Sequence, residues 1–326
     1  MYKKETFTAV ILFFILQICF AQSSFQNLEL GKNSLNYKGN PLKATDRKSL
    51  AFSDKGAWFG FGFLEQSEMQ GGFSGPFLMT EQNGVWLSSS FISLHLTDKN
   101  EQELIDWKTA LVNQNSYNSH LEQEFQNEKL EVKQQLVFSS GHSAIQKTSI
   151  TNRSSKTITL YPIYNSKTYL DNMQLSTEGQ FLKLVSSKSN AVGYIQFFNE
   201  GIDIVITKDS FTAKANKLTL KPNETKEIVV SQTYIFPQYD WKKENENLAK
   251  IQFNTVLKDT KKEKENQLAQ LIAKKKSIYK GAEYSIFIAK LLLTLQNNTR
   301  IPAEGLKHEG LFPSYHYEWF HGFWAW

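Results

Sequence analysis

The stretch LEVKQQLVFSSGHSAIQKTSITNRSSKTITLYPIY, residues 130–164, decides the fold class of this chain. It contains three short runs with strand character, residues 130–138, 144–150 and 157–164. The segments between them are rich in serine, glycine and asparagine, which favour turns. Residues 130–164 therefore predict three consecutive β-strands.

The same pattern continues towards residue 236. Residues 192–198 and 202–208 flank Asn199-Glu200-Gly201, which predicts a β-hairpin. A short run at 218–220 and a longer one at 228–236 follow. Short strands at this spacing are typical of sandwiches. We therefore predict an antiparallel β-sandwich domain over residues 22–238, so the chain is mainly β with an α-helical C-terminal part.

The pattern changes after Tyr239. Residues 241–280 contain no glycine or proline and are rich in lysine, glutamate, glutamine, leucine and alanine, which favour helix. We interpret residues 239–283 as a helical linker that makes few contacts with the sandwich core, so that the sandwich can fold alone. Residues 284–295 are apolar on almost every side, which predicts a helix buried between other helices.

The composition excludes several protein classes. With 326 residues, 40% of them hydrophobic and 21% charged, the chain is neither disordered nor collagen-like. Its one cysteine, Cys19, lies in the leader described below, so disulfides, thiol catalysis and thiolate zinc sites are not expected. Residues 258–280 hold eight lysines and three acidic residues, which fits the solvated face of an amphipathic helix. A nucleic-acid partner is therefore not expected.

The first 21 residues have the pattern of a signal peptide. Lys3 and Lys4 precede an apolar run at residues 7–20, and Ala21 ends an acceptable cleavage site. The run is shorter than a membrane span, and no later stretch is apolar enough to be one. We therefore expect a periplasmic or secreted protein without a membrane span, whose mature chain begins at Gln22. Attachment to lipid through Cys19 is the alternative.

The C-terminal residues WFHGFWAW, 319–326, are unusual for the end of a domain, because termini are normally polar. Only about thirty residues follow the apolar helix at 284–295, too few to cover it with a helical layer. We therefore expect that the sequence stops inside a helical domain.

Two groups of motifs resemble glycoside hydrolase family 63 and its bacterial α-glucosidase relatives. The first comprises GAWFG at 56–60, GGFSGP at 71–76 and LMTE at 78–81; the second comprises LQNNTR at 295–300, Pro302, Gly305, Gly310, Pro313-Ser314 and WFHGFWAW at 319–326. The resemblance implies a β-sandwich (supersandwich), a helical linker and, from residue 284 to residue 326, the first part of an (α/α)6 barrel. It also implies hydrolysis of α-linked oligosaccharides with inversion at the anomeric carbon.

The resemblance further implies which residues contact sugar. Candidate substrate-binding residues are Arg300, Trp319, Phe320, Trp324 and Trp326; the alternative is that the aromatic ones pack the barrel core. No residue of this chain matches the two catalytic carboxylates, which come from later barrel helices, so the chain alone is expected to be inactive and to need the missing C-terminal barrel portion as a partner. No cofactor is expected. The spacing of His308, His316 and His321 matches no metal site.

A second hypothesis belongs to another class of function. The chain could be a complete β-sandwich module that binds carbohydrate or a partner protein without catalysis. Such a module has no need of the apolar region at residues 284–326, and this region distinguishes the two hypotheses.

Overall fold

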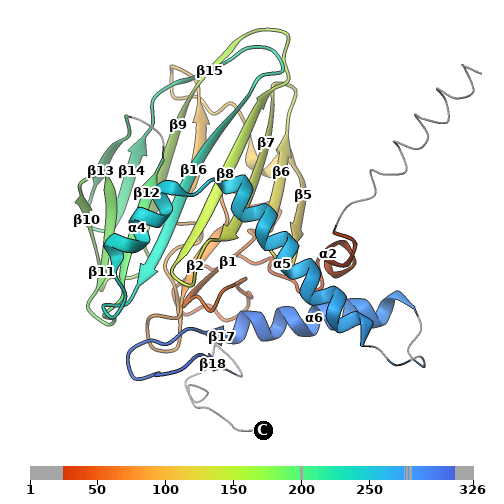
Figure 1. The fold of residues 1–326 in the computed structure, drawn as a ribbon. Helices are drawn as coiled ribbons and strands as arrows, with labels where there is room; N and C mark the ends of the chain where they lie inside the picture. Colours follow the sequence, from red (N-terminus) through yellow and green to blue (C-terminus); the bar gives the residue numbers. More distant parts are fainter. Residues whose placement is uncertain (1–24, 199–200, 275, 277, 279–280, 313–326) are drawn as a thin grey trace, which may run out of the picture.

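The chain folds mainly into antiparallel β-sheets with few helices (Figure 1). The computed structural model describes residues 25–198, 201–274, 276, 278 and 281–312. The predicted signal peptide at residues 1–21 lies outside the described residues.

The larger sheet has eight strands in the order β10-β11-β12-β16-β8-β7-β6-β5, all antiparallel. Their bounds are β5 Leu111–Ser116, β6 Leu121–Gln126, β7 Leu130–Phe138, β8 Ser143–Asn152, β10 Met173–Glu178, β11 Phe181–Ser186, β12 Val192–Phe197 and β16 Thr225–Ile235. The prediction of β7 coincides with the observed strand, and those of β8, β12 and β16 differ from the observed bounds by at most three residues.

A second sheet is built around β9 (Ile158–Lys167). β4 (Ser93–Thr97) pairs with one edge of β9, and the other edge pairs with β14 (Ser210–Lys214), which leads to β13 (Asp203–Ile206), and with β15 (Leu218–Leu220). A three-stranded sheet contains β1 (Phe59–Gly62), β2 (Ser74–Leu78) and β3 (Val85–Trp86), and a small ladder joins β17 (Thr299–Arg300) to β18 (Gly310–Leu311).

The main hydrophobic core lies between the two large sheets. The ring of Tyr164 on β9 lies 5.0 Å from that of Phe197 on β12, and Phe197 in turn contacts Phe211 on β14. Side chains alternate across each strand, so a strand with one buried face contributes every second residue to this layer. The predicted β-sandwich is thus confirmed.

The predicted hairpin at residues 192–208 is wrong. β12 pairs with β11 and β16 in the eight-stranded sheet, whereas β13 pairs with β14 in the other sheet. The two runs therefore belong to opposite layers. Turn residues show where a chain changes direction, but the partner of each strand is decided by which sheet can bury its apolar face.

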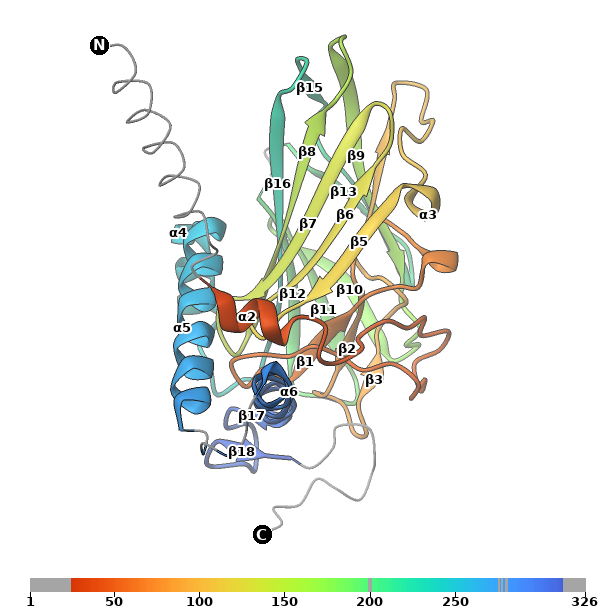
Figure 2. The same cartoon turned by 90° about the vertical axis from the view of Figure 1, so that its right-hand side faces the viewer.

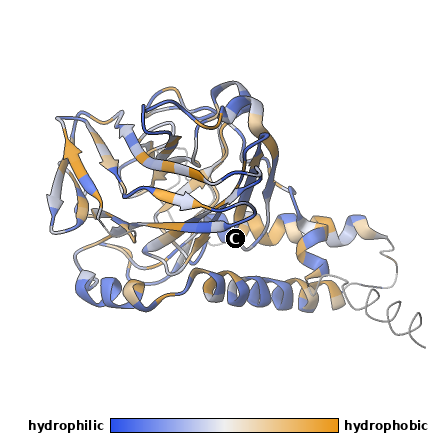
Figure 3. Ribbon diagram, turned by 90° about the horizontal axis from the view of Figure 1, so that it is seen from above, coloured by the Kyte–Doolittle hydropathy of each residue, from blue (hydrophilic) through white to orange (hydrophobic). Residues whose placement is uncertain are grey.

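Two helices follow the sandwich, α4 (Trp241–Lys250) and α5 (Phe253–Ala273). The Asp240 side chain caps α4 by accepting hydrogen bonds from the backbone N–H groups of Lys242 and Lys243. Both helices lie along the outer face of the eight-stranded sheet (Figures 1 and 2). Figure 3 colours much of α5 blue, as expected for its lysine- and glutamate-rich solvent face.

The expectation that this helical segment makes few contacts with the sandwich is wrong. Leu248, Phe253 and Leu257 pack against Val137 of β7 and Ile145 of β8, two buried residues on the outer face of the sheet. The indole of Trp241 stacks on Tyr194 of β12 at 3.9 Å. Helix propensity predicts that these residues are helical, but it does not show that the outer face of the sheet also carries apolar residues.

Four further helical segments complete the described part of the fold. They are α2 (Gln26–Gly31), α3 (Trp107–Ala110), the 3-10 turn η1 (Gln66–Glu68) and α6 (Ala282–Asn298). α6 confirms the predicted helix at residues 284–295 and runs across the lower end of the molecule in Figure 1. α2 packs against both α5 and α6. No helix of the described residues is both long and apolar enough to span a membrane.

Candidate functional site

α6 has one face packed onto the sandwich. Ser285, Ala289, Leu293 and Asn297 are its buried residues, spaced four apart along one side of the helix. Leu293 reaches the main core, and Ala289 packs with Leu28 of α2 and Leu268 of α5. This face consists of two small residues, one leucine and one amide.

Amides at the end of α6 fix it to the sandwich. Asn297 accepts a hydrogen bond from the backbone N–H of Ser53 at 3.1 Å and donates to the Tyr37 hydroxyl at 2.6 Å. The Gln296 side chain donates to the carbonyl of Asn118 at 3.0 Å, and Asn118 donates back to the carbonyl of Ala289 at 3.0 Å. These hydrogen bonds define the position of α6, whereas Asn118 Oδ1 and Gln296 Oε1 are buried and lack a partner among the described residues.

The two groups of motifs that carry the family resemblance meet just beyond α6. The N–H of Ile301 donates to the carbonyl of Gly56 at 2.9 Å, and the indole N–H of Trp58 donates to the carbonyl of Ile301 at 3.0 Å. Gly56 has φ +73°, and a Cβ there would lie 2.8 Å from the Ile301 nitrogen. Glycine is required at this close approach. Residues separated by more than 240 positions thus form one junction.

Arg300 lies inside this junction. Its side chain is 2% exposed, and its Nη2 contacts the sulfur of Met79 at 2.6 Å, while its Nη1 donates to the carbonyl of Thr299. The guanidinium faces the motif region of β2 rather than solvent. Its role as a sugar contact stays a prediction. The other predicted sugar contacts, Trp319, Phe320, Trp324 and Trp326, lie outside the described residues.

The solvent-facing side of α6 carries large apolar residues beside the polar Glu283, Lys290 and Thr294. Ile286, Phe287, Leu291 and Leu295 are between 41% and 59% exposed, and Leu311 of β18 is exposed nearby in the chain. Large exposed apolar side chains that lie close together are typical of surfaces that pack against another element or a partner.

A buried ion pair that the sequence does not reveal joins α5 to the same end of the sandwich. Lys264 Nζ lies 2.8 Å from Asp54 Oδ1, and the two side chains are 7% and 1% exposed. Burial raises the pKa of Asp54 above its ordinary value, against the opposing effect of Lys264. Lys264 belongs to the lysine-rich segment predicted to be solvated, and only the packing of α5 shows that it points inwards.

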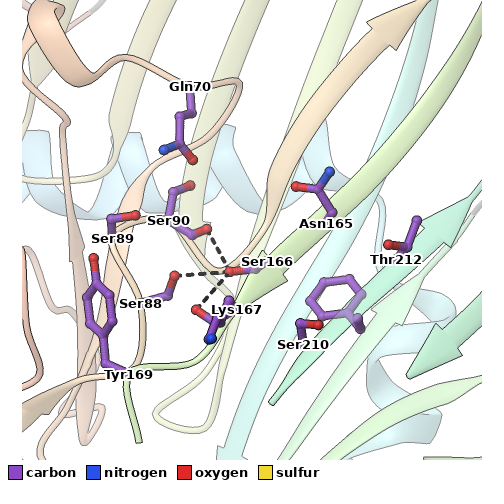
Figure 4. A pocket seen from close by; sticks show the side chains of 11 residues that line it. Gln70, Ser88, Ser89, Ser90, Asn165, Ser166, Lys167, Tyr169, Ser210 and Thr212 are labelled. Carbon is purple, nitrogen blue, oxygen red and sulfur yellow. Dashed lines mark hydrogen bonds between the residues drawn. The ribbon is translucent and has the colours of Figure 1, made fainter. Parts of the chain in front are cut away.

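A polar pocket of about 590 Å³ lies elsewhere, at the end of the second sheet. It opens where the pairing of β4 with β9 stops at Asn165, between the loop 87–92 and the start of β14 (Figure 4). The serine triplet Ser88-Ser89-Ser90 was the only sequence signal of this site, and serines between strands ordinarily indicate a turn.

A glutamine network holds the loop beside this pocket. Gln123 donates to the carbonyl of Gly72 at 2.9 Å and to Gln134 at 2.8 Å, and Gln134 donates to the carbonyl of Gly71 at 3.1 Å. A Cβ on Gly71 would lie 2.1 Å from the Leu94 carbonyl oxygen. The first glycine of GGFSGP therefore allows this loop to lie close to the backbone of β4, and this approach places Gln70 at the pocket.

The described residues contain no group of three or more histidine, cysteine, aspartate or glutamate side chains that could hold a metal.

Two titratable side chains are buried within the sandwich. The imidazole of His120 stacks on the ring of Tyr117 at 4.6 Å, and burial lowers the pKa of His120 to about 4. Glu81 accepts hydrogen bonds from Ser186 and Asn172 and is buried. His308 is exposed, and His316 and His321 lie outside the described residues.

Comparison with known proteins identifies the N-terminal half. Residues 39–193 match the family described as "Glucosidase YgjK, N-terminal". This match covers β1 to β11, ends at the second residue of β12, and includes the first group of resemblance motifs. The chain therefore contains a glucosidase-like N-terminal domain. No curated protein sequence matches the chain.

Solved structures of similar fold include the following two proteins. A human-microbiome protein assigned as a kojibiose phosphorylase has a TM-score of 0.54 at 12% identity, over 76% of this chain and 39% of that one. A family GH92 alpha-mannosidase from Bacteroides thetaiotaomicron has a TM-score of 0.51 at 9% identity, over 84% of this chain and 42% of that one. This chain spans about two fifths of their length. At such identities the likeness concerns the fold alone.

Proposed function

We propose that this chain is the N-terminal part of a glycosidase that hydrolyses α-linked oligosaccharides with inversion, as in glycoside hydrolase family 63. The observation that carries the proposal is the match of residues 39–193 to a glucosidase N-terminal domain. The second group of motifs, at residues 295–326, supports family 63 in particular.

In this proposal α6 is the first helix of an (α/α)6 barrel. Its inner face is fixed to the sandwich by Leu293 and Asn297, while Phe287 and Leu291 point outwards. A helix with one face docked and an apolar face exposed is suited to receive further helices. The barrel portion beyond residue 326 would cover this face.

The reaction needs two carboxyl groups on opposite sides of the glycosidic bond, about 6.5–9.5 Å apart, so that a water molecule fits between one of them and the anomeric carbon. Later barrel helices would supply them. Trp319, Phe320, Trp324 and Trp326 would offer flat apolar faces to the sugar rings, and Arg300 would be a further sugar contact. The chain alone would then bind sugar weakly and leave the bond intact.

The test has two parts. The coding sequence after the Trp326 codon should continue in frame with an aspartate codon, and the longer product should hydrolyse an aryl α-glucoside. The purified 326-residue chain should not. A stop codon together with a native mass equal to this chain would overturn the proposal, as would turnover by the purified chain that a point substitution within it abolishes.

Export is a separate part of the proposal, and it rests on Lys3, Lys4, the apolar run at 7–20 and Ala21. N-terminal sequencing of the protein from its native host should give Gln22 as the first residue. An intact Met1 on the protein recovered from the cytoplasm would contradict export.

A further inference from the structure

The pocket at the end of the second sheet has the size of a small-molecule site. Its volume of about 590 Å³ falls within the range of roughly 300–1,000 Å³ that such sites occupy. Its walls come from three separate segments, namely the loop 87–92, the end of β9 with the residues after it, and the start of β14. Figure 4 shows their side chains around a common space.

The pocket is lined by hydroxyl and amide groups. Five serines and Thr212 supply hydroxyls, Gln70 and Asn165 supply amides, and Tyr169 supplies an exposed aromatic ring. The Tyr169 hydroxyl donates to the Pro41 carbonyl at 2.9 Å, which fixes its ring, and His95 Nε2 lies 3.2 Å from Asn165 Oδ1, which orients that amide. Groups of this kind donate and accept hydrogen bonds without carrying charge.

The charge of the pocket is balanced. No aspartate or glutamate lines it, and its one cation, Lys167, is paired with Asp209 at 3.0 Å. A phosphate, sulfate or uronate ligand would need an excess of positive charge, and a lipid or planar hydrophobic ligand would need apolar walls. The lining residues supply no excess of positive charge, and Phe211 and Tyr169 are the only aromatic residues among them.

A buried hydroxyl in the wall lacks a partner within the described chain. Ser90 is 2% exposed, and its Oγ makes no hydrogen bond with any described residue. Its neighbour Ser166 Oγ is satisfied, because it pairs with Ser88 Oγ at 3.0 Å and donates to the Ser90 carbonyl at 3.1 Å (Figure 4). Buried hydroxyls are normally paired, so Ser90 Oγ has hydrogen-bonding capacity that no described residue uses.

We propose that this pocket binds a neutral carbohydrate of one or two sugar rings. The ring hydroxyls would replace water at the serine, threonine and amide groups, and the Tyr169 ring would cover the apolar face of one sugar. The pocket is separate from the α6 junction, so it would hold a second part of a long glycan or anchor the protein to one. This inference goes beyond the proposed hydrolytic function and does not depend on the barrel.

The experiment is calorimetric titration of the full chain with maltotriose, isomaltotriose, cellotriose and mannotriose, each tested separately. Saturable binding of at least one neutral sugar is expected. Thr212→Trp fills the pocket from β14 and should weaken that binding at least tenfold. Ser89→Trp does so from the opposite wall and serves as a second variant should Thr212→Trp fail to fold.

Thr177→Trp on β10 is the matched control, since Thr177 is exposed and does not line the pocket; it should bind like the unchanged chain. A uronic acid trisaccharide should bind less tightly than the neutral sugars. The inference is overturned if none of the four sugars saturates, if both folded pocket variants bind normally, or if the uronic acid sugar binds best. None of these results bears on hydrolysis by the longer product, so the two proposals fail separately.

Discussion

Asp54 and Lys264 form the most deeply buried ion pair among the described residues, and they connect the GAWFG region to α5. A second Asp54 oxygen, Oδ2, is buried without a hydrogen-bond partner in the described chain. Removing one member of such a pair leaves a charge in a medium that solvates it poorly, whereas removing both does not. The pair therefore determines the position of α5, and its net contribution to the free energy of unfolding is small.

Lys264→Met should lower the free energy of unfolding by about 3 kcal/mol at neutral pH, because Asp54 is then buried without a counter-charge. The double variant Asp54→Asn/Lys264→Met should recover at least half of that loss. Urea denaturation followed by circular dichroism measures both. Equal losses of unfolding free energy in the single and double variants would show that the unpaired charge of Asp54 does not cause the destabilisation.

The same variant has a defined pH dependence. Since the pKa of Asp54 is raised in the folded protein, the folded state holds this proton more tightly than the unfolded chain. The stability that comes from this group is present below its unfolded pKa of 3.8 and is lost as pH rises through the folded pKa. Without Lys264 the pKa of Asp54 in the folded protein rises further. The stability difference between Lys264→Met and the unchanged chain should therefore be smaller near pH 4 than near pH 7.

His120 provides an independent test of pH dependence. Burial lowers its pKa to about 4 from 6.5, against the opposing effect of Glu122 at 3.8 Å and with smaller effects of Lys261 and Lys133. The unfolded chain then binds this proton more readily, so stability falls as pH drops from 6.5 towards 4. Between pH 7 and about pH 4.5, the unchanged chain should lose about 2 kcal/mol more than His120→Gln. Parallel losses in the two proteins would contradict this assignment.

The orientation of α6 about its own axis is decided by the tertiary structure and not by its sequence. Its sequence predicts a helix that is apolar on nearly all sides, and the structure shows which side is docked: Ala289, Leu293 and Asn297 face the sandwich, and Phe287 and Leu291 do not. Periodicity could not make this choice, because leucines occur on both faces. The choice depends on the amide contacts to Ser53 and Tyr37, residues far away in the sequence.

A matched pair of leucines tests this orientation. Leu293→Ala should destabilise the fold by about 3 kcal/mol, because it leaves a cavity in the main core. Leu291→Ala removes the same atoms two residues away on the exposed face and should change stability by less than about 0.5 kcal/mol. Thermal or urea unfolding of the two variants gives the comparison. A larger effect for Leu291 would mean that α6 is rotated relative to this structure.

At the scale of the whole molecule, the three C-terminal helices act as part of the sandwich rather than as a tether beyond it. α4 and the first part of α5 lie against the outer face of the eight-stranded sheet, the rest of α5 packs on α2 and α6, and α6 contributes Leu293 to the main core. A sheet face that carries Val137 and Ile145 is left exposed to water if the helices are removed. The predicted boundaries at residues 238 and 283 are therefore crossed by many contacts.

A chain cut after Pro237 should accordingly be much less stable than the full chain. Leu248, Phe253, Leu257 and Leu293 are lost with the helices, a burial term of roughly 6 kcal/mol or more, so the melting temperature should fall on the order of 15 °C or the transition should lose cooperativity. A chain ending at Phe312 keeps every described helix and is the control. Equal melting temperatures for the full chain, the chain cut after Pro237 and the chain ending at Phe312 would show that the stability of the sandwich does not depend on the helices.

The sequence by itself determined what is local in this protein. The runs 130–138 and 228–236, the turns between strands and the helices after Asp240 follow from short-range patterns of apolar, turn-forming and capping residues, and the structure confirms them. Only the tertiary structure decided that β12 and β13 enter different sheets, that Lys264 is buried, that GAWFG meets the end of α6, and that Ser90 faces a pocket. The physical reason is that each of these features depends on contacts between residues far apart in the chain, where the available partner surface, not local propensity, sets the free energy.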